Sequence, residues 1–493
     1  MIALRLPRRG AARAPRAGFS LIELMISVGL SLVIVAALAA ILLNISRTNT
    51  EMAKSNSQIE SGRFAIQVLE NDLVHAGFWG GFVPEFDDLN WPFVPADTPN
   101  QPPNPCLSYT ANNWNFDYIN ALLGIAVQTY EDAPGTCLLP NKRPNTDVLV
   151  VRHAQTCLAN NPVTNLPEPG CEAEVAGKLY FQSSLCATGT AGTARALILG
   201  EDPATQIKLA ALGGSSTTST MDGAYTGMTI RLTGGPGAGQ TRKITAYNKG
   251  SQTATVDTAW TTAPTILTTY AIIESRLSTN DFSLKARGAD CATAAVATKR
   301  KFVSSIYYIR DYATTAGDGI PTLVRSSFDP GSTVALAHQA AEALVEGVED
   351  MSFELGIDNK VTRCGLNTAT NYAVKVTKYD PLTCAATSDD TRKMLPINRG
   401  DGNPDDFVRC TTAVPCTAAQ LSDVVAVKMF LLVRNSEASP GYKDGKTYCL
   451  ASYKADGTCP AASLTAAQND GYKRHLFSTT VRLTTISGRR ETP

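Results

Sequence analysis

One uninterrupted apolar segment constrains this chain more than any other feature. Residues 24–43 carry no charge, and this length matches the roughly 20 residues with which a helix crosses the hydrocarbon core of a bilayer. Five arginines and no acidic residue precede the segment within residues 1–18. Because basic flanks stay on the cytoplasmic side, the pattern predicts that the leader is cytoplasmic and that the rest of the chain is exported.

The cysteines agree with export, because all twelve lie beyond the apolar segment. They are Cys106, Cys137, Cys157, Cys171, Cys186, Cys291, Cys364, Cys384, Cys410, Cys416, Cys449 and Cys459. An even number of cysteines in an exported chain predicts disulfides. The chain has no C-x-x-C pair and its four histidines lie far apart, so the spacing does not favour a metal site. The pairing is not readable from the sequence, although Cys410/Cys416 and Cys449/Cys459 would close the shortest loops.

Length and charge exclude several classes of protein. With 493 residues, 44% of them apolar, the chain can build two or three cores and is not a disordered protein. Basic and acidic residues balance at 44 each, and without the leader the rest has a net charge of −5. Generic nucleic-acid binding is therefore not predicted. No G-x-S-x-G, H-E-x-x-H or phosphate-loop lysine motif occurs, so the sequence predicts neither an enzyme nor a cofactor.

The apolar segment has three ordinary interpretations and one unexplained residue. It could be a secretory signal cleaved after Ala39, a signal anchor, or a core helix. None of these explains Glu23, since a carboxylate in hydrocarbon costs about 2.5–3.5 kcal/mol and normally has a partner. No Lys, Arg or His occurs from Phe19 to Ser46. Cleavage between Gly18 and Phe19 would create an amine and make Glu23 the fifth residue of the new chain.

The stretch GFSLIELMISVGL resembles the class III signal of type IV prepilins and pseudopilins. The resemblance implies that a prepilin peptidase cuts between Gly18 and Phe19 and N-methylates Phe19. It also implies that Glu23 neutralises the terminal amine of an adjacent subunit during assembly. A pseudopilin of type II secretion would share this signal, so that alternative stays open.

The helix is predicted to continue well beyond the apolar segment. Apolar or small residues recur at helical spacing at Ile59, Gly62, Ile66, Leu69, Leu73 and Ala76. Gly77 is a plausible helix terminator. A helix over residues 21–76 would be about 84 Å long, with its second half packed on a globular head.

The remainder is predicted to be mainly β, with strands at 302–310, 320–325, 350–358, 424–433 and 475–486. Aromatic residues after the helix are expected to make its first contacts with the head: Phe78, Trp79, Phe82, Phe86, Trp91 and Phe93. The segments YYIRD, IPTLVR, EGVEDMSFELGID and VVAVKMFLLVRN, together with the helix end GRFAIQVLENDLVHAGFWG, resemble PilW-type minor pilins. Between these ends lies an insert, in which residues 222–273 resemble a small β module of phage tail and surface proteins.

Two further motifs favour loops over binding sites. Residues 234–241 imitate a phosphate loop, but Gln240 stands where the motif needs lysine and a strand is predicted to follow, so a hairpin turn is favoured. The acidic clusters at 389–390 and 401–406 lack the ligand spacing of a calcium loop. No metal site is predicted.

Together these features predict an α+β protein: a long pilin helix packed on a mainly β, disulfide-containing head with an inserted β module. The predicted divisions are a removed leader (1–18), the helix (19–77), a variable region (78–299, with the insert at about 200–290) and a PilW-like region (300–493). The resemblance implies a structural subunit of the type IV pilus, acting in assembly initiation and the tip complex. Expected partners are other minor pilins, the major pilin, the prepilin peptidase, the inner-membrane assembly platform and a tip adhesin. The expected location is the inner membrane, with the C-terminus periplasmic, and then the pilus; an adhesin role is the other alternative.

Overall fold

The computed structural model divides into two compact units, residues 1–57 and 58–493, which are described separately. The structure describes all residues except 1–17, 19, 89–94, 96, 111–112, 136, 138, 160–165, 185–190, 211–217, 280–281, 283, 288–292, 332–335, 360–377, 380–385, 388–399 and 492–493.

The first element is the long helix that the sequence predicts. Helix α1 spans Leu21–His75 and has 55 residues. Gly77 follows it with a φ of 71°, a left-handed conformation that glycine adopts without steric cost. The Gly77 N–H donates to the backbone oxygen of Arg152 at 3.0 Å. The predicted terminator therefore both ends the helix and attaches its end to the head.

The other helices are short, and three pairs of strands form isolated ladders. The helices are η1 (Glu85–Asp87), α2 (Phe116–Gly124), α4 (Ala418–Ser422), η2 (Ala461–Ser463) and α5 (Thr484–Arg490). The ladders pair β11 (Lys285–Arg287) with β12 (Thr293–Val296), β18 (Lys378–Tyr379) with β19 (Ala386–Thr387), and β22 (Tyr448–Cys449) with β23 (Leu464–Thr465).

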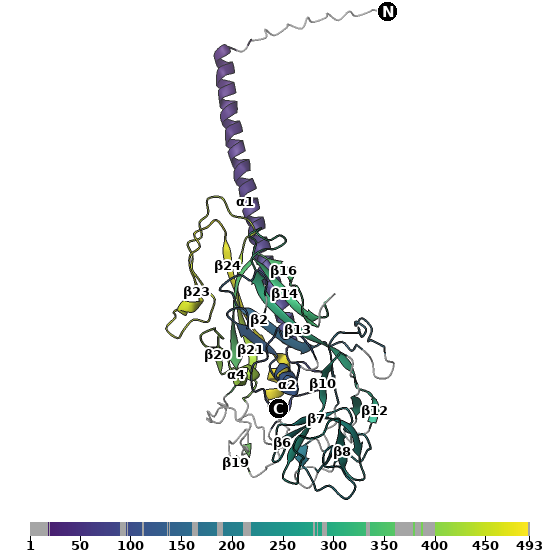
Figure 1. Ribbon diagram of the computed structural model, residues 1–493. Helices are drawn as coiled ribbons and strands as arrows, with labels where there is room; N and C mark the ends of the chain where they lie inside the picture. The colour runs from purple at the N-terminus through teal and green to yellow at the C-terminus, as the bar shows by residue number, and fades with distance from the viewer. Residues whose placement is uncertain are drawn as a thin grey trace, which may run out of the picture. The chain divides into compact units, whose positions relative to one another are not determined.

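The largest sheet is antiparallel and is built around β13. Its strands are β1 (Val127–Tyr130), β2 (Val148–Ala154), β3 (Tyr180–Ser183), β10 (Ser275–Ser278), β13 (Lys299–Arg310), β14 (Thr322–Asp329), β15 (Ala337–His338) and β16 (Glu342–Glu346). Strand β13 pairs with β2 and β14, which lie on either side of it in Figure 1. This sheet joins strands from both sides of residue 300, so the predicted variable region and PilW-like region share one sheet.

A second sheet has four strands in the order β20-β17-β21-β24. They are β20 (Asp406–Val408), β17 (Val348–Ile357), β21 (Val424–Arg434) and β24 (Arg474–Arg482). The predicted last strand, 475–486, is wrong at its end, because the strand stops at Arg482 and α5 begins at Thr484. The chain turns there since the Leu483 N–H still bonds to Val425, while Ile486 reaches the hydrophobic core.

A third sheet lies within residues 191–273 and closes into a small barrel. Its order is β4-β9-β6-β7-β8-β5, and the ends are joined by an antiparallel bridge between Arg195 and Lys208. The strands are β4 (Ala191–Thr193), β5 (Gln206–Lys208), β6 (Thr229–Gly234), β7 (Thr241–Asn248), β8 (Thr253–Val256) and β9 (Thr269–Ile273). Figure 1 shows β6, β7 and β8 gathered together. The barrel has its own hydrophobic core and is called the inserted barrel below.

The main core lies between the second half of α1 and the two larger sheets. Leu69 and Leu73 of α1 are fully buried there, together with Leu149 of β2 and Val425 of β21. A separate aromatic cluster surrounds Trp79, whose ring stacks on Phe302 at 6.0 Å between centroids. The long helix and the mainly β head, with its disulfides, confirm the predicted α+β class.

Candidate subunit-assembly site

The first candidate site is the start of α1, where the sequence places Gly18, Phe19 and Glu23. Gly18 is exposed, and Phe19 lies outside the described residues. The Glu23 carboxylate accepts a hydrogen bond from the Ser20 N–H at 3.0 Å. It thus satisfies one of the backbone donors that a helix N-terminus leaves open, and its charge suits the positive end of the helix dipole.

The apolar part of α1 has no cover within the described part of the chain. The large apolar side chains between Leu21 and Ile45 are each at least 51% exposed. A window of this helix reaches a mean hydropathy of 2.8, and α1 is the single helix among the described residues that is long and apolar enough to cross a membrane. A helix with apolar side chains on all faces needs lipid or other apolar helices around it. The helix therefore fits membrane anchoring.

The second half of α1 is attached to the head by one buried face. Gly62, Leu69, Leu73 and Ala76 of the predicted stripe are buried, whereas Ile59 and Ile66 are half-buried. Gly62 lies so close to β24 that an added Cβ would overlap the Phe477 ring. The predicted stripe is therefore mainly a packing surface, and any larger residue at position 62 would require the Phe477 ring to move.

Polar groups extend this attachment at both ends of the buried face. The buried Gln58 amide donates to the backbone oxygens of Val433 at 2.6 Å and Lys473 at 3.0 Å. Asp72 accepts a hydrogen bond from the Tyr307 hydroxyl at 2.9 Å and contacts His153 Nε2 at 2.8 Å. Burial acts to raise the pKa of Asp72, but the contacts with His153 and Tyr307 outweigh it and hold that pKa below its usual value. The helix is therefore held to the head by an ionised carboxylate.

The C-terminal helix α5 fixes the segment after α1 to the rest of the head. Arg490 is fully buried, and its guanidinium lies 3.2 Å from Asp87 and 3.0 Å from Asp423. It also donates to the Asp358 backbone oxygen at 2.8 Å. Burial raises the pKa of Asp358 to about 6, although Arg490 opposes the shift. One side chain thus joins η1, the end of β17 and the start of β21.

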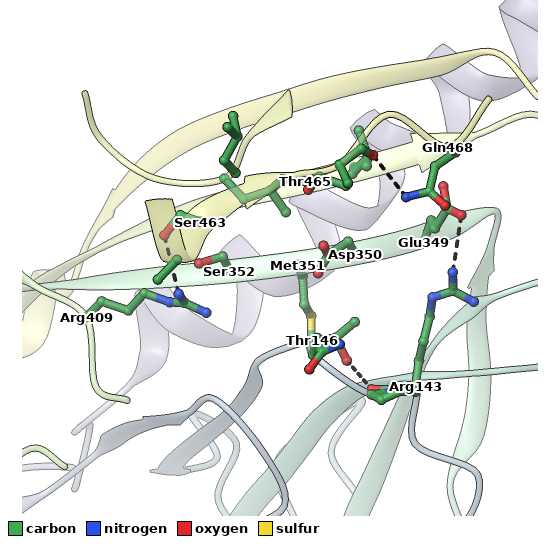
Figure 2. Close-up of a pocket in the computed structure, with 17 residues that line it drawn as sticks. Arg143, Thr146, Glu349, Asp350, Met351, Ser352, Arg409, Ser463, Thr465 and Gln468 are labelled. Atoms are coloured by element: carbon green, nitrogen blue, oxygen red, sulfur yellow. Dashed lines mark hydrogen bonds and ion pairs between the residues drawn. The ribbon is translucent and has the colours of Figure 1, made fainter. Parts of the chain in front are cut away.

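A polar cavity of about 300 Å³ lies beside β17 (Figure 2). Two of its charged side chains form ion pairs: Arg143 Nη2 lies 3.3 Å from Glu349, and Arg409 Nη2 lies 2.7 Å from the neighbouring Asp147. Figure 2 shows Ser463 and Gln468 on the opposite wall. Among the described residues, no group of three or more His, Cys, Asp or Glu side chains could hold a metal ion. We interpret the cavity as part of an ion-pair network between strands.

Asp350 in this cavity gives the head a testable dependence on pH. Burial, with the charge of Asp147, raises the pKa of Asp350 to about 7. Because the folded state then holds a proton that the unfolded chain releases near pH 4, stability contributed by this group falls as pH rises from about 4 to 7. Asp350→Asn is expected to stabilise the chain by roughly 2–4 kcal/mol at pH 7.5 and to change nothing at pH 4.

Urea unfolding of the detergent-solubilised chain, followed by tryptophan fluorescence at the two pH values, measures this difference. Asp222→Asn, at an exposed carboxylate, is the matched control and should leave the pH dependence unchanged. An Asp350→Asn variant that is equally or less stable than the wild type at pH 7.5 would contradict the assignment.

The structure pairs eight of the twelve candidate cysteines. The disulfides are Cys106–Cys137, Cys157–Cys171, Cys410–Cys416 and Cys449–Cys459. The two shortest loops considered in the sequence are among them. Cys186, Cys291, Cys364 and Cys384 lie outside the described residues. The first disulfide joins the segment before α2 to the segment after β1, and the others close local loops.

Of the three segments that the sequence assigned to loops, two lie within the described residues, 234–241 and 401–406. Residues 235–240 form the turn between β6 and β7, and Gln240 bonds to the loop at Thr261 and Thr262. Asp401 and Gly402 donate their N–H groups to the Asp358 carboxylate, so this acidic segment supports the Arg490 network. The other cluster, 389–390, lies outside the described residues, as do Trp91 and Phe93.

Comparisons with known proteins match both ends of the chain. A family model described as type IV pilus-assembly protein W matches residues 306–485, which extend from β13 into α5. A model of the prokaryotic N-terminal methylation motif matches residues 13–39. No curated protein gives a significant match.

Among solved structures, the type IV-like pilin TTHA1219 from Thermus thermophilus is similar over 38% of this chain and 70% of its own. The sequence identity is 14% and the TM-score 0.18, values too low to support an argument about the fold. The likeness to known proteins therefore rests on the two family models. They confirm the resemblance of this chain to the PilW-type minor pilins of type IV pili.

Proposed function

We propose that this minor pilin acts early in pilus assembly and lies in the complex at the pilus tip. A prepilin peptidase would remove residues 1–18 and methylate Phe19. The helix would hold the chain in the inner membrane, with the head in the periplasm, until the assembly platform transfers it into the fibre. Its neighbours there would be other minor pilins, the major pilin and a tip adhesin.

The observation that carries this proposal is the combination of an uncovered apolar helix with one acid and no base. Glu23 caps its own helix, but no basic side chain occurs from Phe19 to Ser46 to neutralise it. In an apolar environment the carboxylate needs a positive partner. The methylated amine of a neighbouring Phe19 supplies such a charge, and both groups would occur once in every subunit.

The size of the head supports a position near the tip. Removal of the leader leaves 475 residues, and the inserted barrel adds a third sheet to the two that hold α1. A head of this size is difficult to repeat along a thin filament, whereas a terminal complex imposes no helical repeat. Because Glu23 is retained, we place the chain next to a subunit above it and not at the apex itself.

Replacing Glu23 tests the proposal directly. The Glu23→Ala protein is expected to stay in the membrane but to be depleted at least tenfold from sheared pili, because its helix no longer attracts a neighbour's amine. Immunoblots of membrane and pilus fractions measure the distribution. Glu60→Ala, which removes an exposed carboxylate from the same helix, is the matched control and should enter pili normally.

Mass spectrometry of the same fractions separates assembly from processing. Wild type and both variants should begin at Phe19, and the pilus-derived protein should carry a methyl group there. A chain that is intact from Met1, or trimmed beyond Ala39, would contradict the proposal. Normal incorporation of Glu23→Ala would refute the pairing role, and recovery only in a type II secretion filament would favour the pseudopilin alternative.

A further inference from the structure

Arg152 of β2 is buried in the head without an acidic partner. Its side chain is fully inaccessible to solvent, and its Nη1 donates to the Ile125 backbone oxygen at 3.1 Å. Its Nε and Nη2 atoms are also buried and have no hydrogen-bond acceptor among the described residues. The buried Arg490, by contrast, lies against the carboxylates of Asp87 and Asp423. Arg152 is therefore a buried cation whose counter-charge does not come from the described part of the chain.

The ionisable side chains around Arg152 are uncharged near neutral pH. Those that interact electrostatically with the guanidinium are Tyr118, Tyr130 and His338. Burial raises the pKa of Tyr118 to about 12 and also raises the pKa of Tyr130. Burial, assisted by the charge of Arg152, lowers the pKa of His338 to about 4. None of these three side chains can therefore balance the guanidinium at pH 7.

An unbalanced guanidinium is strongly unfavourable in this position. Although burial lowers the pKa of Arg152, a guanidinium keeps its proton at neutral pH. Removing such an ion from water is costly unless an opposite charge lies beside it. Water molecules could accept hydrogen bonds from the two free N–H positions but would add no charge. A negative ion would satisfy the hydrogen bonds and the charge together.

A further hydrogen-bond donor lies on the same face of the sheet. Gln128 is the partner of Val150 across β1 and β2, so the side chains of Gln128 and Arg152 lie on one face. The Gln128 Nε2 donates to the Tyr130 hydroxyl at 2.8 Å, which leaves the hydroxyl hydrogen available to another acceptor. Tyr130 and Arg152 are close enough to influence each other's charge. The Tyr130 O–H and the free N–H groups of Arg152 together suit a negatively charged acceptor.

We propose that the Arg152 guanidinium binds a small monovalent anion of chloride's size inside the head. The enclosed position favours such an ion, because phosphate, sulfate and carboxylate ions are larger or more strongly hydrated and cost more to bury. The Gln128 Oε1 atom is a buried acceptor without a donor, which a water molecule bound to the anion would supply. The site lies next to the end of α1, since the Arg152 backbone oxygen accepts the Gly77 N–H at 3.0 Å. This inference does not depend on a role in pilus assembly.

The test compares sodium chloride with sodium gluconate at constant ionic strength, because gluconate is too large for an enclosed site. The unfolding temperature of the detergent-solubilised full chain is measured at pH 7.5 by tryptophan fluorescence. It should rise with the chloride concentration and saturate, with a shift of roughly 3 °C at a hundredfold excess over the dissociation constant. The linewidth of the chloride NMR signal, which exchange with the bound ion broadens, measures binding independently.

Arg152→Met should abolish both chloride effects, and Tyr130→Phe, which removes one donor and keeps the ring, should raise the chloride concentration at half-effect several-fold. Arg325→Met is the matched control, since Arg325 of the same sheet pairs with Glu342 nearer the surface, and it should keep the chloride dependence. Equal unfolding temperatures of the wild type in the two salts would overturn the proposal, as would a chloride dependence that Arg152→Met retains. If Arg152→Met does not fold, an unchanged chloride dependence in Tyr130→Phe would overturn it.

Discussion

An Arg490→Met variant is expected to lose about 3–5 kcal/mol of its free energy of unfolding, because one change removes the positive centre of a buried charge cluster. Arg490 is fully buried, and Asp87, Asp358 and Asp423 surround it. Methionine fills a similar volume but leaves these carboxylates close together without the Arg490 cation, although Asp87 still contacts Arg489 Nη1 at 3.1 Å. It also leaves the Asp358 and Ser422 backbone oxygens without their donor.

Urea unfolding at pH 7.5, followed by tryptophan fluorescence, measures the loss. Arg482→Met is the matched control, since Arg482 pairs with Glu491 at the surface and exposed pairs contribute at most about 1 kcal/mol. Adding Asp87→Asn and Asp423→Asn to Arg490→Met should recover part of the stability by removing two of the carboxylate charges that Arg490 faces in the wild type. If the Arg490→Met variant alone is as stable as the wild type, the buried charge cluster does not hold the head together.

The sequence predicted the parts of the fold that depend on local pattern. The uncharged run and the apolar stripe both follow the period of a helix, so α1 was predicted to within one residue of its end at His75. Strands β13, β17 and β21 are long and strongly apolar, and their predicted positions agree with the structure to within three residues. In each case neighbouring residues in the chain carry the signal.

Contacts between distant residues could not be predicted in this way. Arg490 follows a strand-like stretch near the C-terminus, and nothing in that stretch indicates that it reaches Asp87, more than 400 positions earlier. The same contact explains why the last strand ends early: α5 must turn inward to bury this arginine. Closure of the inserted barrel was also missed, because β4 and β5 have three residues each, too few for a recognisable alternation.

The candidate assembly site also has a part that a local sequence pattern reveals and a part that depends on contacts between distant residues. Gly18, Phe19 and Glu23 form a contiguous motif, so a resemblance was enough to find them. The attachment of α1 through Gln58 and Asp72 has no such signal, since both residues look like ordinary polar positions on a helix. Their partners, Val433 and His153, become neighbours only after the sheets have formed.

A Gly192→Ala variant is expected to open the inserted barrel at the junction of β4 and β5. The added methyl group would overlap the Ala210 backbone oxygen and approach the Tyr270 hydroxyl to 2.7 Å. Backbone atoms cannot move aside as a flexible side chain can. The barrel should therefore lose about 3 kcal/mol of its free energy of unfolding, the upper end for overfilling a packed region. The Arg195 N–H, which donates to the Lys208 backbone oxygen at 2.9 Å, should then exchange its hydrogen with solvent much faster.

Hydrogen exchange measured by mass spectrometry locates this effect within the chain. Peptides covering β4 and β5 should exchange much faster, while those covering β13 and β21 keep their protection, because the barrel has a core of its own. Gly445→Ala is the matched control, since nothing lies within 4 Å of its added Cβ. Unchanged protection of β4 would contradict the closure of the barrel.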